Sequence, residues 1–272
     1  MTAPHREQSA DFHQIAGEAL CLAGGGSALL LQIAHPAVGR GVVEHSDFAN
    51  RLMDRFHATM MFVYAAAFAS PDEFSTVLRS VNRAHAPVRA PASGERPAYN
   101  AFDTDLQRWV SATLFATMTD LHERVFGPQT GDSKEQVYQD FIHLGRNLQL
   151  VAEDWPTTRS GFQTYWDDMV AGLRVSDETR VVARQILYPR EVPLWLRAAL
   201  PGARLVTAGL LPARVREQFD LPWNPAIERR FERRMRTFAA IYPRLPSALR
   251  HRPRDVYLRR LRRTIHADST AS

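Results

Sequence analysis

Signals for the start of a helix recur along this chain, whereas the apolar–polar alternation typical of strands hardly appears. Ser70-Pro71-Asp72-Glu73 has Ser at an N-cap and Glu three residues later, which is a capping box, and Ser133-Lys134-Glu135-Gln136 has the same pattern. Ser176 precedes two acids that suit a first helical turn. Apolar residues at helical spacing predict about ten helices, around 14–34 and near 46–68, 71–86, 104–126, 133–153, 160–172, 176–188, 203–211, 224–241 and 253–265. The sequence therefore predicts an all-α fold.

The composition fits one globular unit. The chain has 272 residues, of which 45% are hydrophobic and 23% charged, and these values exclude a disordered, a collagen-like or a multi-span membrane protein. We expect a single multi-helix domain: residues 1–228 form the all-α body, and residues 229–272 form a basic helical extension packed on it or trailing from it.

Positive charge is concentrated near the C-terminus. Residues 1–228 have a net charge of −5, whereas residues 229–263 contain 13 arginines and two acids, a net charge of +11. An arginine-rich helix has one of three roles: it faces solvent, contacts an anionic membrane or binds nucleic acid. No helix-turn-helix or zinc pattern accompanies it, so specific nucleic-acid binding is not expected, whereas peripheral membrane contact through this segment remains open.

An uncharged stretch of 21 residues, 19–39, has the length of a membrane span. It contains Gly24-Gly25-Gly26 and then His35-Pro36, so we expect a buried helix with glycines at a close helix contact and a break near His35. The single cysteine and an N-terminus without a secretory pattern predict a reduced, cytoplasmic setting.

His85 ends an apolar stripe. Phe74, Val77, Leu78, Val81 and His85 share one face of the predicted 71–86 helix. A histidine in this position is either a satisfied core residue or a ligand offered to a group inside the bundle. Neutral imidazole is a common axial ligand of haem iron.

Arg55 and Thr59 lie four residues apart on the stripe of the preceding helix, with Leu52, Phe56 and Val63. A buried arginine needs an anionic partner or a dense set of hydrogen bonds. A haem propionate, a substrate carboxylate or a neighbouring protein acid would each serve.

Residues 32–46 combine several polar side chains with a helix break. His35, Glu44 and His45 are candidates for a non-haem metal site, which stays open as an alternative. The chain has no G-x-S-x-G, Walker A or Cys-x-x-Cys pattern.

The run LLLQIAHPAVGRGVVEHSDF (29–48), followed by Arg55-x-x-x-Thr59, by His85 in NRAHAPV, and by Tyr99 and Asp103 leading to Trp109, resembles the MpaB/rubber-oxygenase family over roughly residues 20–175. Members include the latex-clearing proteins, which cleave polyisoprene, and a fungal oxygenase that shortens a farnesyl chain.

The resemblance implies an all-α protein with haem b and a histidine as the proximal iron ligand, which matches His85. It places Arg55 and Thr59 beside the haem. Glu44 matches the family's acidic base by position only, and His45 is expected to act with it in catalysis and His35 to help bind the cofactor. The lysine that caps the iron in latex-clearing proteins is replaced here by Ala58, and an absent secretion signal makes a polymer substrate unexpected.

The resemblance, together with the position of His85 on the apolar stripe, implies that residues 1–228 form a haem-dependent oxygenase domain. We expect it to use O2 on an apolar or aromatic small molecule, by cleavage of a C=C bond or by another oxygenation. Two alternatives stay open. One is a haem protein of other activity, such as a peroxidase, a nitric-oxide-handling enzyme or a sensor. The other is a haem-free helical protein that binds nucleic acid or anionic lipid through its basic segment.

Overall fold

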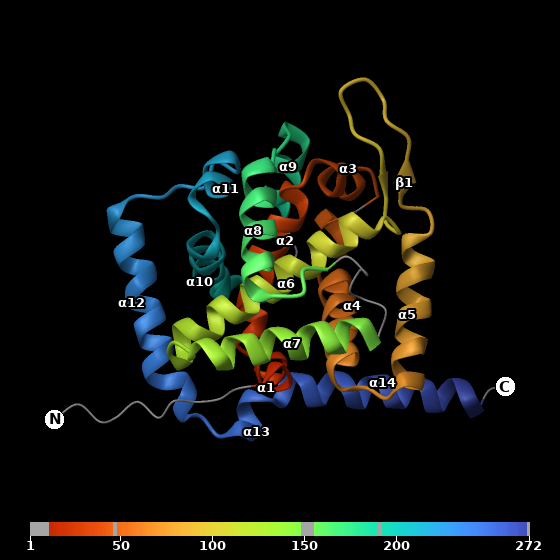
Figure 1. Ribbon diagram of the computed structural model, residues 1–272, viewed down its shortest axis with the longest axis vertical. Helices are drawn as coiled ribbons and strands as arrows, with labels where there is room; N and C mark the ends of the chain where they lie inside the picture. The colour runs from red at the N-terminus through yellow and green to blue at the C-terminus, as the bar shows by residue number, and fades with distance from the viewer. Residues whose placement is uncertain (1–10, 46–47, 148–154, 190–191, 271–272) are drawn as a thin grey trace.

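Helix α2 (Cys21–Ala34) lies at the centre of the molecule, packed between α6 (Thr104–Phe126) and α10 (Leu194–Leu210) (Figure 1). The computed structural model describes residues 11–45, 48–147, 155–189 and 192–270. A Cβ added at Gly24 would lie 2.8 Å from Cγ2 of Thr117 on α6, and one added at Gly26 would collide with the hydroxyl of Thr207 on α10. The glycines therefore permit close helix contact, as predicted.

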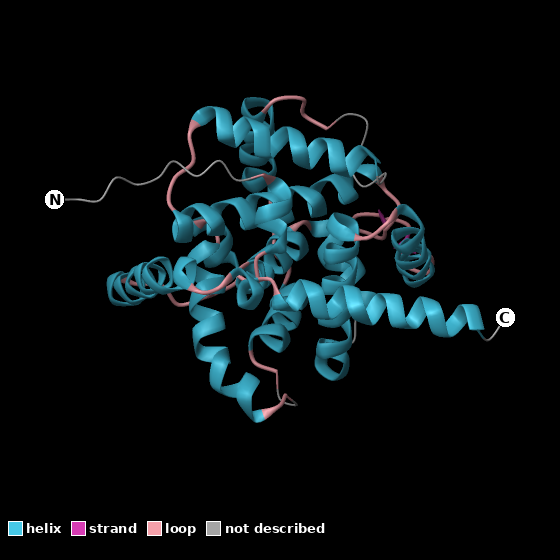
Figure 2. Ribbon diagram, turned by 90° about the horizontal axis from the view of Figure 1, so that it is seen from below, coloured by secondary structure: helices cyan, strands magenta, loops and turns pink. Residues whose placement is uncertain are grey.

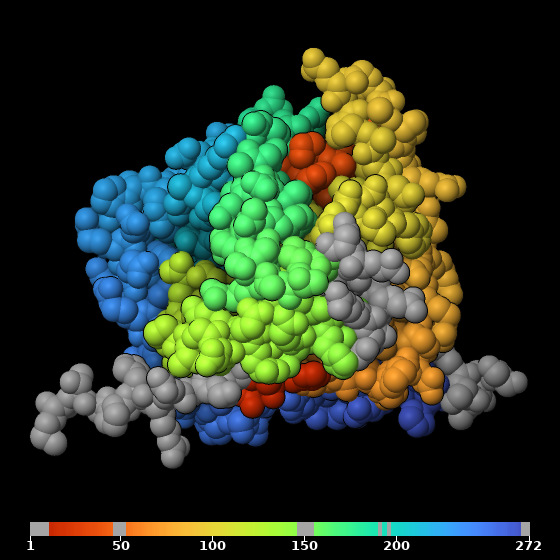
Figure 3. Space-filling view, in the orientation of Figure 1, coloured from red at the N-terminus to blue at the C-terminus, as the bar shows by residue number. Residues whose placement is uncertain are grey.

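The other elements wrap around this three-helix centre, and the predicted all-α architecture is confirmed. The remaining α-helices are α1 (Phe12–Gly17), α3 (Pro36–His45), α4 (Phe48–Phe68), α5 (Pro71–His85), α7 (Gly131–Asn147), α8 (Arg159–Gly172), α9 (Asp177–Leu187), α11 (Ala213–Gln218), α12 (Pro225–Ile241), α13 (Ser247–Arg250) and α14 (Arg252–Thr270). A 3-10 turn, η1 (Tyr242–Arg244), follows α12. The loop predicted at 87–98 belongs to an antiparallel hairpin of β1 (Arg89–Ala90) and β2 (Tyr99–Asn100), in which Ala90 pairs with Tyr99. Figure 3 shows this hairpin projecting from the body in yellow.

Aromatic rings fill the main core beside α2. Trp109 of α6 is fully buried, and its indole Nε1 donates a hydrogen bond of 3.1 Å to the carbonyl of Leu31. Phe115 and Phe162 meet edge to face with ring centroids 5.2 Å apart. These contacts fix α8 over the centre of the fold, because large rings have few alternative packings in a filled core.

Most helix starts follow their sequence signals. The Ser70 capping box is present in full, Asp103 caps α6 and Ser176 caps α9. The start predicted at Ser133 is wrong: α7 begins two residues earlier, and the hydroxyl of Thr130 accepts a hydrogen bond from the backbone N–H of Ser133. The end of this helix predicted at residue 153 lies outside the described residues, as does the start of the 46–68 helix predicted at residue 46.

Two predicted helices differ from the structure. The helix expected around 14–34 is divided into α1 and α2 by a short turn at Glu18. The helix expected at 203–211 begins at Leu194 and contains Pro201, which apolar spacing alone does not reveal. The break predicted near His35 is confirmed, since α2 and α3 meet there at 104°.

In the part of the chain that the structure describes, no single helix is long and apolar enough to cross a membrane. Among the helices described, the bent pair of α2 and α3 together has the required length and composition.

The basic C-terminal helices pack on the body. Phe231 and Met235 of α12 are buried beside α6 and α10, and Leu261 of α14 is buried against Phe74 of α5. In Figure 2, seen from below, α14 lies across the underside of the molecule. The boundary expected between residues 228 and 229 falls within α12.

Candidate functional site

Helices α4 and α5 pack side by side, and Arg55 of α4 lies close enough to His85 of α5 for its charge to lower the pKa of the imidazole. Arg55 and Thr59 are four residues apart on α4 and therefore share a face of that helix. His85 is the last residue of α5. Three of the predicted site residues are thus grouped on two neighbouring helices.

Of the side chains that the structure describes in the first half of α4, from Met53 to Thr59, none is buried. Every residue from Asp54 to Thr59 is exposed, including the large apolar side chain of Phe56 at 37%, whereas Met60, Tyr64 and Ala65 in the second half are buried. A helix inside a domain normally buries one face against a neighbour. The expectation that Arg55 lies on a buried stripe is therefore wrong: Arg55 and Thr59 are both exposed, and the contact that α14 makes here is to His57, whose Nδ1 lies 2.6 Å from the Tyr257 hydroxyl.

His85 is accessible to solvent but partly enclosed. Desolvation lowers the pKa of its imidazole, and the guanidinium charge of Arg55 lowers this pKa further. Among the hydrogen bonds of the described residues, none involves the His85 ring. The arrangement favours a neutral imidazole with a nitrogen lone pair available, in contrast to a satisfied core histidine.

A second group of predicted residues meets at Tyr99 of the hairpin. The Tyr99 hydroxyl donates a hydrogen bond of 2.6 Å to Oε2 of Glu44, and Nε2 of His45 lies 2.8 Å from the same hydroxyl. Because the hydroxyl proton is given to the carboxylate, His45 Nε2 is the donor of the second bond. Arg40 Nε donates to the other carboxylate oxygen of Glu44 at 2.8 Å.

These bonds set the charge state of the cluster. The hydrogen bond from Tyr99, followed by that from Arg40, lowers the pKa of Glu44, so its carboxylate stays ionised. Burial, together with the Glu44 charge, raises the pKa of Tyr99 to about 12, so its hydroxyl keeps its proton. The cluster is a fixed chain of donors and acceptors around one carboxylate.

His35 lies at the bend between α2 and α3, and no described hydrogen bond joins it to either group. Its ring is half-buried, and its Nδ1 has no hydrogen-bond partner in the described structure. Desolvation lowers the pKa of His35, and the nearby Asp103 opposes that shift. Asp103 and Tyr99 both line a pocket of about 490 Å³ beside the hairpin.

The alternative of a non-haem metal site gains no support from the geometry. Within the described ranges, no three His, Cys, Asp or Glu side chains are close enough together to hold a metal ion. His45 and Glu44 are instead joined through Tyr99.

Tyr99 and Arg40 are the site residues that sequence patterns did not select. Tyr99 had been noted only as part of the family resemblance. Only the fold brings it to Glu44, which lies 55 positions earlier in the chain.

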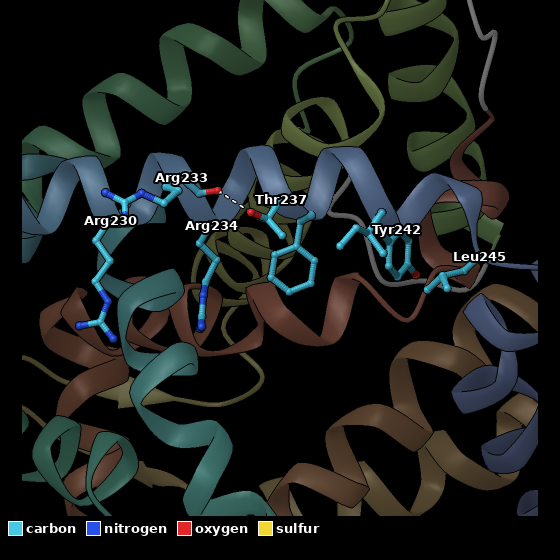
Figure 4. A pocket seen from close by; sticks show the side chains of 8 residues that line it. Arg230, Arg233, Arg234, Thr237, Tyr242 and Leu245 are labelled. Carbon is cyan, nitrogen blue, oxygen red and sulfur yellow. Dashed lines mark hydrogen bonds between the residues drawn. The ribbon is translucent and has the colours of Figure 1, made fainter.

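A separate groove of about 560 Å³ runs along α12, away from α4 and α5. Figure 4 shows Arg230 and Arg234 pointing to the same side of this helix, with Tyr242 and Leu245 farther along. None of the predicted catalytic residues lines the groove.

Comparison with known proteins points to one family. The model of the catalytic domain of the ER-bound oxygenase mpaB/B′ and rubber oxygenase matches residues 13–240. An uncharacterised protein of Mycobacterium tuberculosis and one of Mycobacterium bovis are each 33% identical over 209 residues, which cover 75% of this chain and 82% of each relative. No solved structure matches the chain.

Proposed function

The chain belongs to the family of MpaB-type and rubber oxygenases, and from this membership we propose that it is a haem b-dependent oxygenase with His85 as the proximal iron ligand. The observation that supports the assignment most strongly is that Arg55, in the exposed stretch 54–59 of α4, lies close enough to His85 of α5 for its charge to act on the imidazole.

The residues present fit a haem. A neutral imidazole at the accessible end of α5 suits axial ligation. The Arg55 guanidinium beside it suits a propionate, since Arg binds carboxylates through several donors. The exposed stretch 54–59 supplies a helix face with an apolar side chain, Phe56, against which a flat macrocycle would pack.

A bound haem iron would supply the activation of O2, which no protein side chain provides. His85 would hold the iron, and Arg55 and Thr59 would orient the propionate or stabilise negative charge that develops near them. We place His35 as a further contact at the cofactor side, because its unpartnered Nδ1 has capacity for one more hydrogen bond.

Glu44, Tyr99 and His45 would act as a polar unit at the substrate side. The ionised Glu44 accepts from Tyr99 and Arg40, so it would stabilise positive charge that develops on the substrate. His45 donates to Tyr99 and so holds that hydroxyl toward the carboxylate. The hairpin links this unit to His85, because β1 begins four residues after it.

We propose an apolar or aromatic alkene as substrate. Cleavage of a C=C bond by one O2 converts each alkene carbon into a carbonyl and needs no external reductant. Phe56, exposed beside Arg55, would provide an apolar contact for such a molecule.

The test is O2 uptake by the haem-supplemented protein with squalene or styrene as the alkene. Carbonyl products formed in step with O2 consumption would support the proposal. Arg55→Gln should lower the rate about a hundredfold, whereas Arg79→Gln, at an exposed arginine of α5, should leave it unchanged. Oxidation that needs peroxide and consumes no O2 would overturn the oxygenase assignment in favour of a peroxidase.

A further inference from the structure

The exposed side of α14 is basic from Arg252 to Arg263. Residues Arg252, Val256, Arg259, Arg260 and Arg263 follow helical spacing and are all exposed, and we call this set the α14 face. The opposite side, with Tyr257, Leu258 and Leu261, is buried against the body. The helix is thus anchored by one face and presents the other to its surroundings.

The arginines of the α14 face are not neutralised by neighbours. Among the described residues, none of the four forms an ion pair with an acid. The other arginines of α14 that pair with acids lie outside this face: Arg254 with Asp255 at 2.9 Å and Arg262 with Glu73 at 2.9 Å. The face therefore has four positive charges available to an anionic partner.

Exposed aliphatic side chains lie within the α14 face and on the elements that precede it. Val256 is 45% exposed within the face, and Leu249 of α13 and Ile241 at the end of α12 are 49% and 56% exposed. In Figure 1, α13 lies between the end of α12 and the start of α14 along the lower edge of the molecule. Arginines interspersed with exposed aliphatic side chains match the surface of a lipid bilayer, where both charge and apolar area are accommodated.

We propose that the α14 face docks the protein on an anionic lipid bilayer, with Leu249 and Ile241 contacting the interface at its edge. Charge complementarity selects the anionic surface, since the face contains no acid. The aliphatic side chains favour lipid over nucleic acid, because a phosphate backbone offers them no apolar partner.

Docking by this face leaves the candidate site accessible. Phe74, in the first turn of α5, packs on Leu261 of α14, and His85 is eleven residues farther along α5. At the rise of an α-helix, His85 stands about 16 Å beyond this contact. The proposal does not depend on haem, so it is tested independently of the proposed function.

The experiment is co-sedimentation of the full chain with vesicles of phosphatidylcholine alone or with about one third phosphatidylglycerol, at an ionic strength of about 0.1 M. We expect binding to the anionic vesicles only. The triple variant Arg259→Gln, Arg260→Gln, Arg263→Gln should bind about a hundredfold more weakly, or about fivefold per arginine.

The matched control neutralises three exposed arginines on other helices: Arg79→Gln, Arg159→Gln and Arg214→Gln. It changes the net charge by the same amount and should retain binding within about twofold, if the effect belongs to the α14 face. An equal loss in both triple variants would overturn the proposal, because binding would then follow net charge alone.

A second comparison separates lipid from nucleic acid. Val256→Asn keeps every charge and should weaken vesicle binding several-fold, while leaving any binding to a short DNA duplex unchanged. Duplex binding that depends on Arg259, Arg260 and Arg263, with no binding to anionic vesicles, would contradict the proposal. Circular dichroism of each variant would confirm that the helices are retained.

Discussion

The hydroxyl of Tyr99 donates a hydrogen bond of 2.6 Å to Oε2 of Glu44 and thereby joins the hairpin to α3. This bond is the largest cause of the lowered pKa of Glu44. Tyr99 is buried whereas Glu44 is exposed, so the bond holds a surface carboxylate against a buried hydroxyl. The relationship places one ionised carboxylate at a defined position beside the hairpin.

Replacing Tyr99 by Phe should raise the pKa of Glu44 toward its ordinary value, because the largest cause of the shift is removed and only the charges of Arg40 and Arg96 and the Arg40 hydrogen bond still favour the ionised form. Since a lowered carboxyl pKa stabilises the fold above the ordinary pKa, the variant should lose stability near neutral pH and little at acid pH. Carbon-13 NMR titration of the carboxyl measures the shift. Tyr188→Phe, at an exposed tyrosine, is the control; an unchanged Glu44 pKa in Tyr99→Phe would contradict the account.

Replacing each of two neighbouring glycines of α2 by alanine should change the unfolding free energy in opposite directions. Gly26→Ala pushes a methyl group against Thr207 and should cost about 1–3 kcal/mol of unfolding free energy. Gly25→Ala meets no atom within 4 Å and should stabilise by up to about 1 kcal/mol through helix propensity. Urea unfolding measures both, and Thr207→Ala should partly restore Gly26→Ala. Equal effects at the two positions would show that α2 is not packed against α10 as described.

The buried carboxylate of Glu18 should stabilise the attachment of the C-terminal helices. It accepts a hydrogen bond of 2.9 Å from the Tyr242 hydroxyl and forms an ion pair with Arg250. Glu18→Gln should destabilise by about 3 kcal/mol, because it leaves a partly buried guanidinium without its anion. A double-mutant cycle with Arg250→Gln should give a coupling free energy well above that of an exposed pair, which is about 0–1 kcal/mol. Additive losses would refute the coupling.

His122 should make the protein less stable in mild acid. It is buried against Phe126, with ring centroids 4.5 Å apart, and desolvation lowers its pKa from 6.5 to about 4. Between these values the unfolded chain takes up a proton that the folded chain does not, so the unfolding free energy falls as pH falls, by up to about 3 kcal/mol.

Thermal unfolding between pH 7 and pH 4 measures this loss. His122→Leu should flatten the dependence, whereas His143→Leu, at an exposed histidine, should not. The lowered pKa values of His35 and His85 should also make the unfolding free energy fall with falling pH, so a smaller pH dependence should remain in His122→Leu. An unchanged slope in His122→Leu would contradict the assignment.

Local features of the fold were predictable, because they depend on a few adjacent residues. The Ser70 capping box, the Asp103 cap and the bend at His35 each follow from short sequence patterns. Thr130 displaced Ser133 as the cap of α7 because either hydroxyl suits the position, and only the preceding loop decides between them.

The arrangement of the site depends on contacts distant in the sequence. Helical spacing placed Arg55 and Phe56 on an apolar stripe, but periodicity does not reveal whether another element covers that stripe. Tyr99 reaches Glu44 only because the hairpin folds back along α3. The pairing of His85 with Arg55 requires α5 to pack on α4 in one register, which was suggested by the family resemblance and not by spacing.

The most direct test of the central claim is the absorption spectrum of the protein purified with haem supplied during expression, with a pyridine haemochrome assay. The account predicts a Soret band with about one haem per chain, lost or shifted in His85→Ala and unchanged in His266→Ala, at an exposed histidine of α14. A folded protein that stays colourless on haem titration, or a His85→Ala variant with full haem content and an unchanged spectrum, would contradict it.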